Sequence, residues 1–273
     1  MPLLLSLLAL LSFAGLAAPQ STAISQCDRP VDIVFVVDES GSICQNHPGS
    51  PPQSPPLSGS PPRVNCGDWN RMRTFVSNIS ALFPMGPKNI VTSYISFSND
   101  APMLNYLPLN ASLSGEGFAG KVRNFLMNSG GTATWAGLRE AQAEFALNGR
   151  DAADGAAQMV IVLTDGLSQI PAQTAAKAAE LRASGVLVAA VGVGPIMGPQ
   201  GGAACGPLGP ASGCNTAVCS AQQCNARQEV FNLAARSDLV WANQWTDLTP
   251  ESPILVSLLN AAYLAPIIPP AGG

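Results

Sequence analysis

The sequence predicts an α/β domain: a doubly wound, mostly parallel six-stranded sheet with one antiparallel edge strand and helices on both faces. Apolar, β-branched segments alternate with longer segments of helical character from residue 31 onward. The apolar segments lack the polar alternation of a half-exposed strand, which is typical of parallel strands covered on both faces. Because 47% of the 273 residues are hydrophobic and only 11% are charged, the chain can bury one large core.

The predicted elements follow one another in a regular order. In the first strand, residues 31–37, Asp32 is the only charged residue. Further strands are expected near residues 90–97, 102–107, 158–164, 186–192 and 239–243. Helices are expected near residues 68–82, 115–127, 134–147, 171–184, 226–236 and 253–263. A helical crossover makes the two strands that it joins parallel.

One connection has no helix. Only Ser98 to Ala101 separates the strands at 90–97 and 102–107. Such a short connection leaves no room for a crossover, so these two strands must pair antiparallel. We therefore expect one edge strand to run against the rest of the sheet.

Two segments interrupt the alternation of strands and helices. Residues 44–67 are rich in Pro, Ser and Gly, and residues 195–225 contain four of the seven cysteines. Neither composition can form a core of its own. Both segments leave from the carboxyl ends of strands, the edge where open α/β sheets bind ligands. They are either part of a ligand-binding face or solvated insertions without a role.

The cysteines predict disulfides in a secreted protein. Cys44 and Cys66 bracket the Pro-rich segment and are expected to tie its base. Cys27 is left over, either free or paired with another chain. A zinc site is an alternative for the remaining four, although they lack a Cys-x-x-Cys spacing. These four allow three pairings: Cys205, Cys214, Cys219 and Cys224.

The first 18 residues are not expected to belong to the fold. Residues 1–18 are uncharged and leucine-rich, with Gly15 and Ala17 as the small residues of a cleavage site after Ala17. A membrane anchor is the alternative, but a bilayer span needs about 20 apolar residues. We expect a signal peptide and a secreted, extracellular protein without a membrane span after cleavage. Residues 266–273 form a short tail, and the oligomeric state stays open.

The charge of the chain limits its partners. The formal net charge is −4 and no basic run occurs. Nucleic acids and anionic membranes are therefore not expected to bind.

Oxygen-bearing side chains gather at the predicted carboxyl ends of strands. Asp38 follows the first strand, and Ser40 and Ser42 come at alternate positions after it. Thr132 lies in a Gly-rich turn, and Asp165 follows another apolar strand. A doubly wound sheet brings these segments together. Carboxylate and hydroxyl oxygens are hard ligands, so they predict a site for Mg²⁺, Mn²⁺ or Ca²⁺.

Other interpretations of these residues explain less. Ser, Thr and Asp are common in turns and helix caps, but that explains each segment singly and not all three together. An aspartyl phosphatase that used Asp38 would need a second Asp two residues later, where the chain has Ser40. A serine hydrolase needs a base, and the only histidine, His47, lies in the Pro-rich segment. A metal-dependent hydrolase is thus a weak alternative, and we expect no enzyme.

The three segments resemble the motifs of the von Willebrand factor type A domain, also called the integrin inserted domain. Asp38-Glu39-Ser40-Gly41-Ser42 matches the DxSxS motif, Gly130 to Thr134 matches Gly-Gly-Thr-x-Thr, and Leu163-Thr164-Asp165-Gly166 matches the strand-Asp-Gly motif. The resemblance covers about residues 29–265, interrupted by the two insertions. It implies a Rossmann-like fold with a metal-ion-dependent adhesion site.

The resemblance also implies a role for each motif residue. The hydroxyls of Ser40, Ser42 and Thr132 ligate the ion directly, while Asp38 and Asp165 hold it directly or through water. Mg²⁺ is the expected ion, with Mn²⁺ and Ca²⁺ as alternatives. Neutral hydroxyls leave the ion strongly electrophilic, so an Asp or Glu carboxylate of an extracellular protein ligand can occupy its open coordination position.

The function expected from this resemblance is a secreted adhesion module that binds a protein through the metal. A structural protein of an extracellular matrix or cell wall, with metal-independent interactions, is the alternative that the Pro-rich segment would suit.

Three further residues carry smaller expectations. Asn78 and Asn110 begin N-glycosylation sequons, and Asn110, in a predicted loop, is the better acceptor. Glu39 is expected to point toward solvent.

Overall fold

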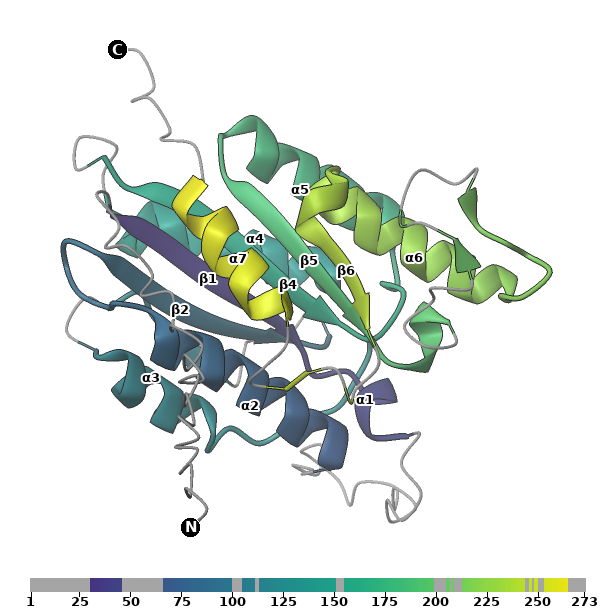
Figure 1. Cartoon of the computed structure of the whole chain (residues 1–273), viewed down its shortest axis with the longest axis horizontal. Helices are drawn as coiled ribbons and strands as arrows, with labels where there is room; N and C mark the ends of the chain where they lie inside the picture. Colours follow the sequence, from purple (N-terminus) through teal and green to yellow (C-terminus); the bar gives the residue numbers. More distant parts are fainter. Residues whose placement is uncertain are drawn as a thin grey trace, which may run out of the picture.

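A computed structural model describes much of the chain and confirms the predicted α/β architecture (Figure 1). The predicted signal peptide, Cys27, the Pro-rich residues 46–65 and the tail at 266–273 lie outside the described residues. The described residues are 30–45, 66–99, 105–110, 113–150, 155–198, 205–206, 208, 213–243, 246, 248–249 and 253–264.

The sheet has six strands in the order β3-β2-β1-β4-β5-β6. All neighbouring strands are parallel except β3, which runs antiparallel to β2 at the edge, as the short connection predicts. The strands are β1 Val31–Asp38, β2 Ile90–Phe97, β3 Tyr106–Leu107, β4 Ala157–Thr164, β5 Leu187–Val193 and β6 Val240–Asn243.

Helices cover both faces of this sheet. In Figure 1, α7 lies across the near face and α4 lies behind the strands. Along the sheet α4 packs beside α5 and α5 beside α6, while α2 packs against α3. None of the helices in the described part of the chain combines the length and hydropathy of a bilayer span. The α-helices are α1 Ser42–Gln45, α2 Gly67–Leu82, α3 Gly115–Val122, α4 Thr134–Asn148, α5 Pro171–Ala183, α6 Ala221–Ala234 and α7 Pro253–Leu264.

Two helices differ from their predicted extent. Helix α6 begins at Ala221, before the predicted start at 226, because Ser220 and Gln223 form a capping box. In it the Ser220 hydroxyl accepts the Gln223 N–H at 3.2 Å, and the Gln223 side chain accepts the Ser220 N–H at 2.9 Å. The Cys-rich insertion predicted at 195–225 therefore ends inside a helix. Helix α3 ends at Val122, five residues before the predicted end at 127.

Three disulfides form among the described residues. Cys44 and Cys66 are bonded, as predicted. The four later cysteines pair as Cys205–Cys219 and Cys214–Cys224, which selects one of the three possible pairings. The zinc alternative for these four is wrong, because their sulfurs bond to one another.

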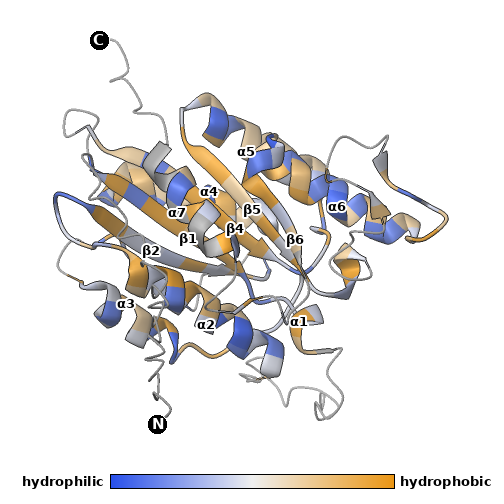
Figure 2. Cartoon of the chain, in the orientation of Figure 1, coloured by the Kyte–Doolittle hydropathy of each residue, from blue (hydrophilic) through white to orange (hydrophobic). Residues whose placement is uncertain are grey.

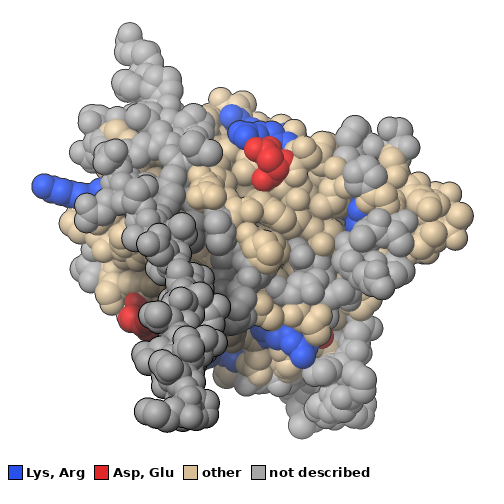
Figure 3. Space-filling model, viewed as in Figure 1, with Lys and Arg blue, Asp and Glu red and all other residues tan. Residues whose placement is uncertain are grey.

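The sheet forms the centre of the core. Every residue of β1 and β2 is buried, and Figure 2 shows hydrophobic strands between helices with hydrophilic outer faces. The face in Figure 3 carries few charged side chains among the described residues. Burial on both faces explains why the strands lack polar alternation.

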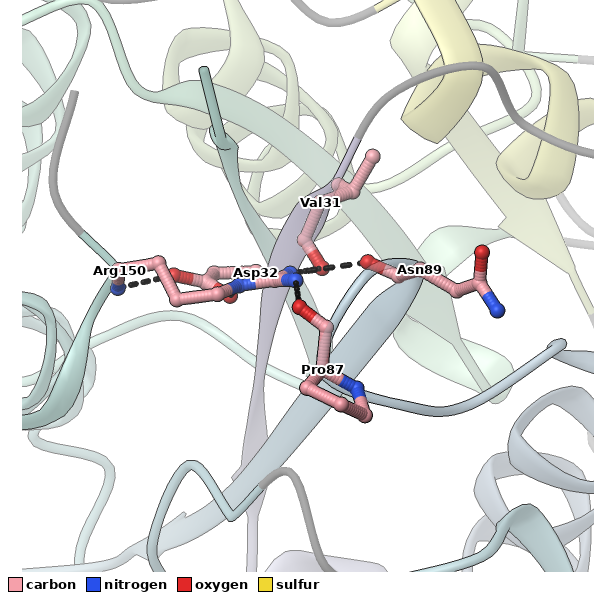
Figure 4. A network of polar contacts seen from close by, with 5 residues as sticks. All are labelled: Val31, Asp32, Pro87, Asn89 and Arg150. Carbon is pink, nitrogen blue, oxygen red and sulfur yellow. Dashed lines mark hydrogen bonds and ion pairs between the residues drawn. The ribbon is translucent and has the colours of Figure 1, made fainter. Parts of the chain in front are cut away.

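The amino end of β1 contains an ion pair between the buried Asp32 and the partly buried Arg150 (Figure 4). The Nε of Arg150 donates to Asp32 Oδ1 at 2.7 Å, and its backbone N–H donates to Oδ2 at 2.7 Å. The Arg150 guanidinium also donates to the carbonyls of Val31, Pro87 and Asn89. These contacts join β1 to the segments that precede β2 and β4.

Candidate metal centre

The carboxyl end of β1 places Asp38 between two neighbouring strands. Asp38 pairs with Phe97 of β2, and Val37 pairs with Leu163 of β4. The Asp38 carboxylate is fully buried. Its Oδ1 accepts the Ser40 N–H at 2.8 Å, and its Oδ2 accepts the Thr164 hydroxyl at 2.7 Å.

The structure brings Asp165 to the same place, although it is 127 residues further along the chain than Asp38. Asp165 Oδ1 accepts the hydroxyl of Ser42 at 2.9 Å and that of Ser40 at 3.4 Å. The two serine oxygens are 2.9 Å apart. Four of the five predicted ligands therefore form one hydrogen-bonded cluster.

Thr132 belongs to a loop that is tied to both segments of this cluster. The Gly130 carbonyl accepts the Gly41 N–H at 2.9 Å, and the Thr132 carbonyl accepts the Gln169 N–H at 2.8 Å. The Asn99 side chain accepts the Gly131 N–H at 2.8 Å. Within the described residues, the Thr132 hydroxyl itself has no hydrogen-bond partner. Its direct contact with a metal stays a prediction.

The backbone conformation of Gly130 favours glycine, and Gly131 lies close to two side chains. A Cβ on Gly131 would lie 2.1 Å from the Gln169 amide nitrogen and 2.9 Å from Asn99 Oδ1. Gly130 has φ of 141°, a conformation that L side chains rarely adopt. Gly130 therefore has a conformational reason to be glycine, whereas a side chain at position 131 would need only the exposed ends of Gln169 and Asn99 to move.

The two aspartates are energetically unfavourable as ionised groups. Burial raises the pKa of Asp38 to about 6, although hydrogen bonds from Thr164 and Ser40 act in the opposite direction. Burial and the neighbouring Asp38 charge raise the pKa of Asp165 well above its usual range. Among the described residues, no Lys, Arg or His forms an ion pair with either carboxylate.

Glu39 does not point toward solvent, and that expectation is wrong. Its side chain is buried and accepts hydrogen bonds from Asn105 Nδ2 at 2.8 Å and from Asn128 Nδ2 at 2.9 Å. Burial raises the pKa of Glu39. The asparagines that enclose it are distant in sequence, so no local pattern around Asp38 indicated its burial.

The donor set suits a hard divalent cation. Carboxylate and hydroxyl oxygens lie within hydrogen-bonding distance of one another here. The described residues contain no group of three or more His, Cys, Asp or Glu, so the hydroxyls would have to complete the ligand set of the two aspartates. A divalent cation would neutralise the two buried negative charges that the described protein groups leave uncompensated. The residues present thus fit such an ion.

A family model for the von Willebrand factor type A domain matches residues 32–202, well over half of the chain. The chain belongs to the von Willebrand factor type A domain family. The match begins in β1 and includes all three segments of the cluster. The described strands and helices beyond residue 202, from α6 to α7, complete the sheet and its helical cover.

Curated relatives carry this domain within longer chains. The human collagen alpha-1(XX) chain is 29% identical over 164 residues, which cover 60% of this chain and 11% of the collagen chain. Human matrilin-1 is 29% identical over 196 residues, covering 71% of this chain and 34% of matrilin-1. This chain therefore spans about a third or less of these relatives.

Solved structures share the von Willebrand factor A fold. Proximal thread matrix protein 1 from the mussel byssus has a TM-score of 0.58 and 21% identity, covering 88% of this chain and 47% of that chain. A second structure of it has a zinc-occupied MIDAS motif, that is, a metal-ion-dependent adhesion site. The pilus adhesin SpaC from Lactobacillus rhamnosus GG has a TM-score of 0.55 and 17% identity, covering 86% of this chain and 30% of SpaC.

Proposed function

We propose that this von Willebrand factor A domain is a secreted adhesion module that binds an extracellular protein through a divalent cation. The observation that carries the proposal is the buried, uncompensated pair Asp38 and Asp165, which receives hydrogen bonds from the hydroxyls of Thr164, Ser40 and Ser42. Relatives named as collagens and matrilin support an extracellular role in protein binding.

Each predicted ligand has a defined part in this proposal. Ser40, Ser42 and Thr132 hold the ion through neutral hydroxyl oxygens, and Asp38 and Asp165 supply the negative charge. Mg²⁺ is the proposed ion, since hard oxygen ligands and retained waters suit it. When bound, the ion supplies an open coordination position for an Asp or Glu carboxylate of the partner. The zinc in the mussel protein supports a divalent cation in this fold.

Other features support an extracellular location. Three disulfides form among the described residues, which is typical of proteins from oxidising compartments. Asn110 is exposed, whereas the Nδ2 of Asn78 is buried within α2. We therefore propose Asn110 as the glycan acceptor. Cleavage of residues 1–18 remains part of the same proposal.

Relaxation of water protons by Mn²⁺ tests the open coordination position. We expect the protein to increase the relaxation that Mn²⁺ causes, because the bound ion keeps exchangeable water. Acetate, as a minimal carboxylate, should lower this enhancement, and the uncharged acetamide should not. The control is Asp38→Asn, which should fold and show no enhancement.

Two results would count against the proposal. An enhancement that acetate leaves unchanged would exclude carboxylate coordination. A folded wild-type protein without any enhancement would favour the metal-independent structural role.

A further inference from the structure

A pocket of about 260 Å³ lies between α5 and α6, beside the loop that follows β4. Leu167 of that loop forms one wall, and Pro171, Ala175 and Leu233 of the two helices form the others. The loop begins at Asp165, so the pocket adjoins the candidate metal centre. None of the proposed metal ligands lines the pocket.

Glu229 brings a carboxylate to this otherwise largely apolar pocket. Its side chain is 7% exposed, and its two oxygens accept the Ser168 N–H at 3.1 and 3.2 Å. Burial raises the pKa of Glu229 to about 7, and the nearby Asp38 charge acts in the same direction. Among the described residues no Lys, Arg or His forms an ion pair with Glu229.

A second acceptor borders the same pocket. The Gln228 Nε2 donates to Asn232 Oδ1 at 2.8 Å, while Gln228 Oε1 is buried without a hydrogen-bond partner among the described groups. Gln228 Oε1 lacks a donor and the Glu229 carboxylate lacks a cationic partner among the described residues, so the two groups together favour a ligand that donates hydrogen bonds.

The size and walls of the pocket narrow the choice of ligand. Sites for drug-sized molecules usually have about 300–1,000 Å³, so this smaller volume suits one side chain. Lys and Arg combine an apolar stem, which can cover walls of Leu, Pro and Ala, with a cationic donor group. The formal net charge of −4 also attracts basic partners.

We propose that the pocket between α5 and α6 binds the basic side chain, arginine or lysine, of a protein partner. The basic group lies against Glu229 and Gln228, and its stem lies against Leu167 and Leu233. This inference rests on the proposed function only in taking the partner to be a protein. The shared loop lets one partner contact both the pocket and the metal centre.

Nuclear magnetic resonance of ¹⁵N-labelled protein in EDTA tests the pocket separately from the metal. The probe is Nα-acetyl-L-arginine methylamide, and the Ser168 amide is the reporter, since it donates to Glu229. We expect a saturable shift of this signal. The uncharged Nα-acetyl-L-norleucine methylamide should bind at least about tenfold more weakly than the arginine probe, because it lacks a charge-assisted hydrogen bond.

Three variants locate the interaction. Glu229→Gln should weaken probe binding about tenfold or more, since it removes the charge and keeps an acceptor for Ser168. Ala175→Leu should weaken binding by filling the pocket. Glu144→Gln is the matched control: Glu144 is also a buried helical glutamate that accepts a backbone N–H, from Leu109, but it does not line the pocket. It should bind the probe as wild type does.

Three results would overturn the inference: no shift at a saturating probe concentration, equal binding of the norleucine probe, or unchanged binding by Glu229→Gln. Because no metal ion is present, each of these results leaves the Mn²⁺ experiment to decide the proposed function independently.

Discussion

Strand β1 carries a fully buried aspartate near each end, and only one of the two is paired with a positive charge. At the amino end, Asp32 accepts two hydrogen bonds from Arg150, one of them from its guanidinium (Figure 4). At the carboxyl end, Asp38 accepts from Thr164, Ser40 and the Asp165 backbone, none of which carries a positive charge, and its carboxylate lies near that of Asp165. The same strand thus has one compensated and one uncompensated end.

The two ends of β1 should therefore affect the stability of the metal-free protein in opposite directions. A buried carboxylate paired with a guanidinium links segments of the fold and needs nothing from outside. Two buried carboxylates without a cation destabilise the folded chain until a positive charge arrives. Under the proposed function, the carboxyl ends of β1 and β4 bind a cation, and their uncompensated charge lowers the stability of the metal-free protein.

Removing the compensated aspartate should have the largest effect on stability. Asp32→Ala leaves the Arg150 guanidinium without its carboxylate in a site where the Arg150 side chain is only 15% exposed. Breaking a buried pair in this way costs about 3–5 kcal/mol. Urea unfolding measured with EDTA should show this loss in the free energy of unfolding. A loss below about 1 kcal/mol, typical of surface ion pairs, would mean that the network contributes little.

Removing the uncompensated charge of Asp38 should increase the stability of the metal-free protein. In the metal-free protein, Asp38→Asn is expected to raise the free energy of unfolding at pH 7 by about 1–3 kcal/mol, because a buried charge beside Asp165 disappears. The same urea experiment with EDTA measures it. Asp32→Asn is the matched control and should be destabilising. If both variants lose the same stability, the two ends of β1 do not differ.

The hydroxyl of Thr132 should affect metal binding and not the stability of the fold. Thr132→Ala is expected to weaken Mn²⁺ binding about tenfold, or 1.4 kcal/mol, while the fold stays intact. Thr132→Ser retains the hydroxyl and should bind within a few-fold of wild type. Mn²⁺ titration followed by electron paramagnetic resonance gives both affinities. Equal binding by wild type and Thr132→Ala would remove Thr132 from the set of ligands.

Glu229 extends the comparison to a third buried carboxylate, whose effect appears as a dependence of stability on pH. Burial raises its pKa from 4.5 to about 7, so the folded protein binds this proton more tightly than the unfolded chain. Its contribution to the free energy of unfolding therefore falls, by up to about 3 kcal/mol, as pH rises between these two values. Ser168 and the Asp38 charge face this group, so the difference between wild type and Glu229→Gln isolates it. Parallel stability–pH profiles would contradict the assignment.

Much of the fold could be predicted because its causes are local. Apolar strands, a connection too short for a crossover and regular helical segments define the sheet, and the order of β1 and β4 follows from their connections. The start of α6 was missed although Ser220 and Gln223 had the capping-box spacing. A single helical turn such as α1 has too few residues to show a period.

The candidate site was predictable to a lesser degree. Asp38, Ser40, Ser42 and Asp165 form one cluster because strand ends converge, and topology alone predicts that. The burial of Glu39 depends on Asn105 and Asn128, which reach it through tertiary packing. A lone charged residue such as Asp32 in an apolar strand indicates that a buried partner exists, but only the structure identifies Arg150.

Isothermal titration calorimetry with Mg²⁺ and Mn²⁺ tests the central claim most directly. The account predicts one saturable site in wild type that Asp32→Asn retains and Asp38→Asn loses, although both variants change one buried aspartate of the same strand. A folded wild-type protein that binds neither ion, or an Asp38→Asn variant that binds as tightly as wild type, would contradict it.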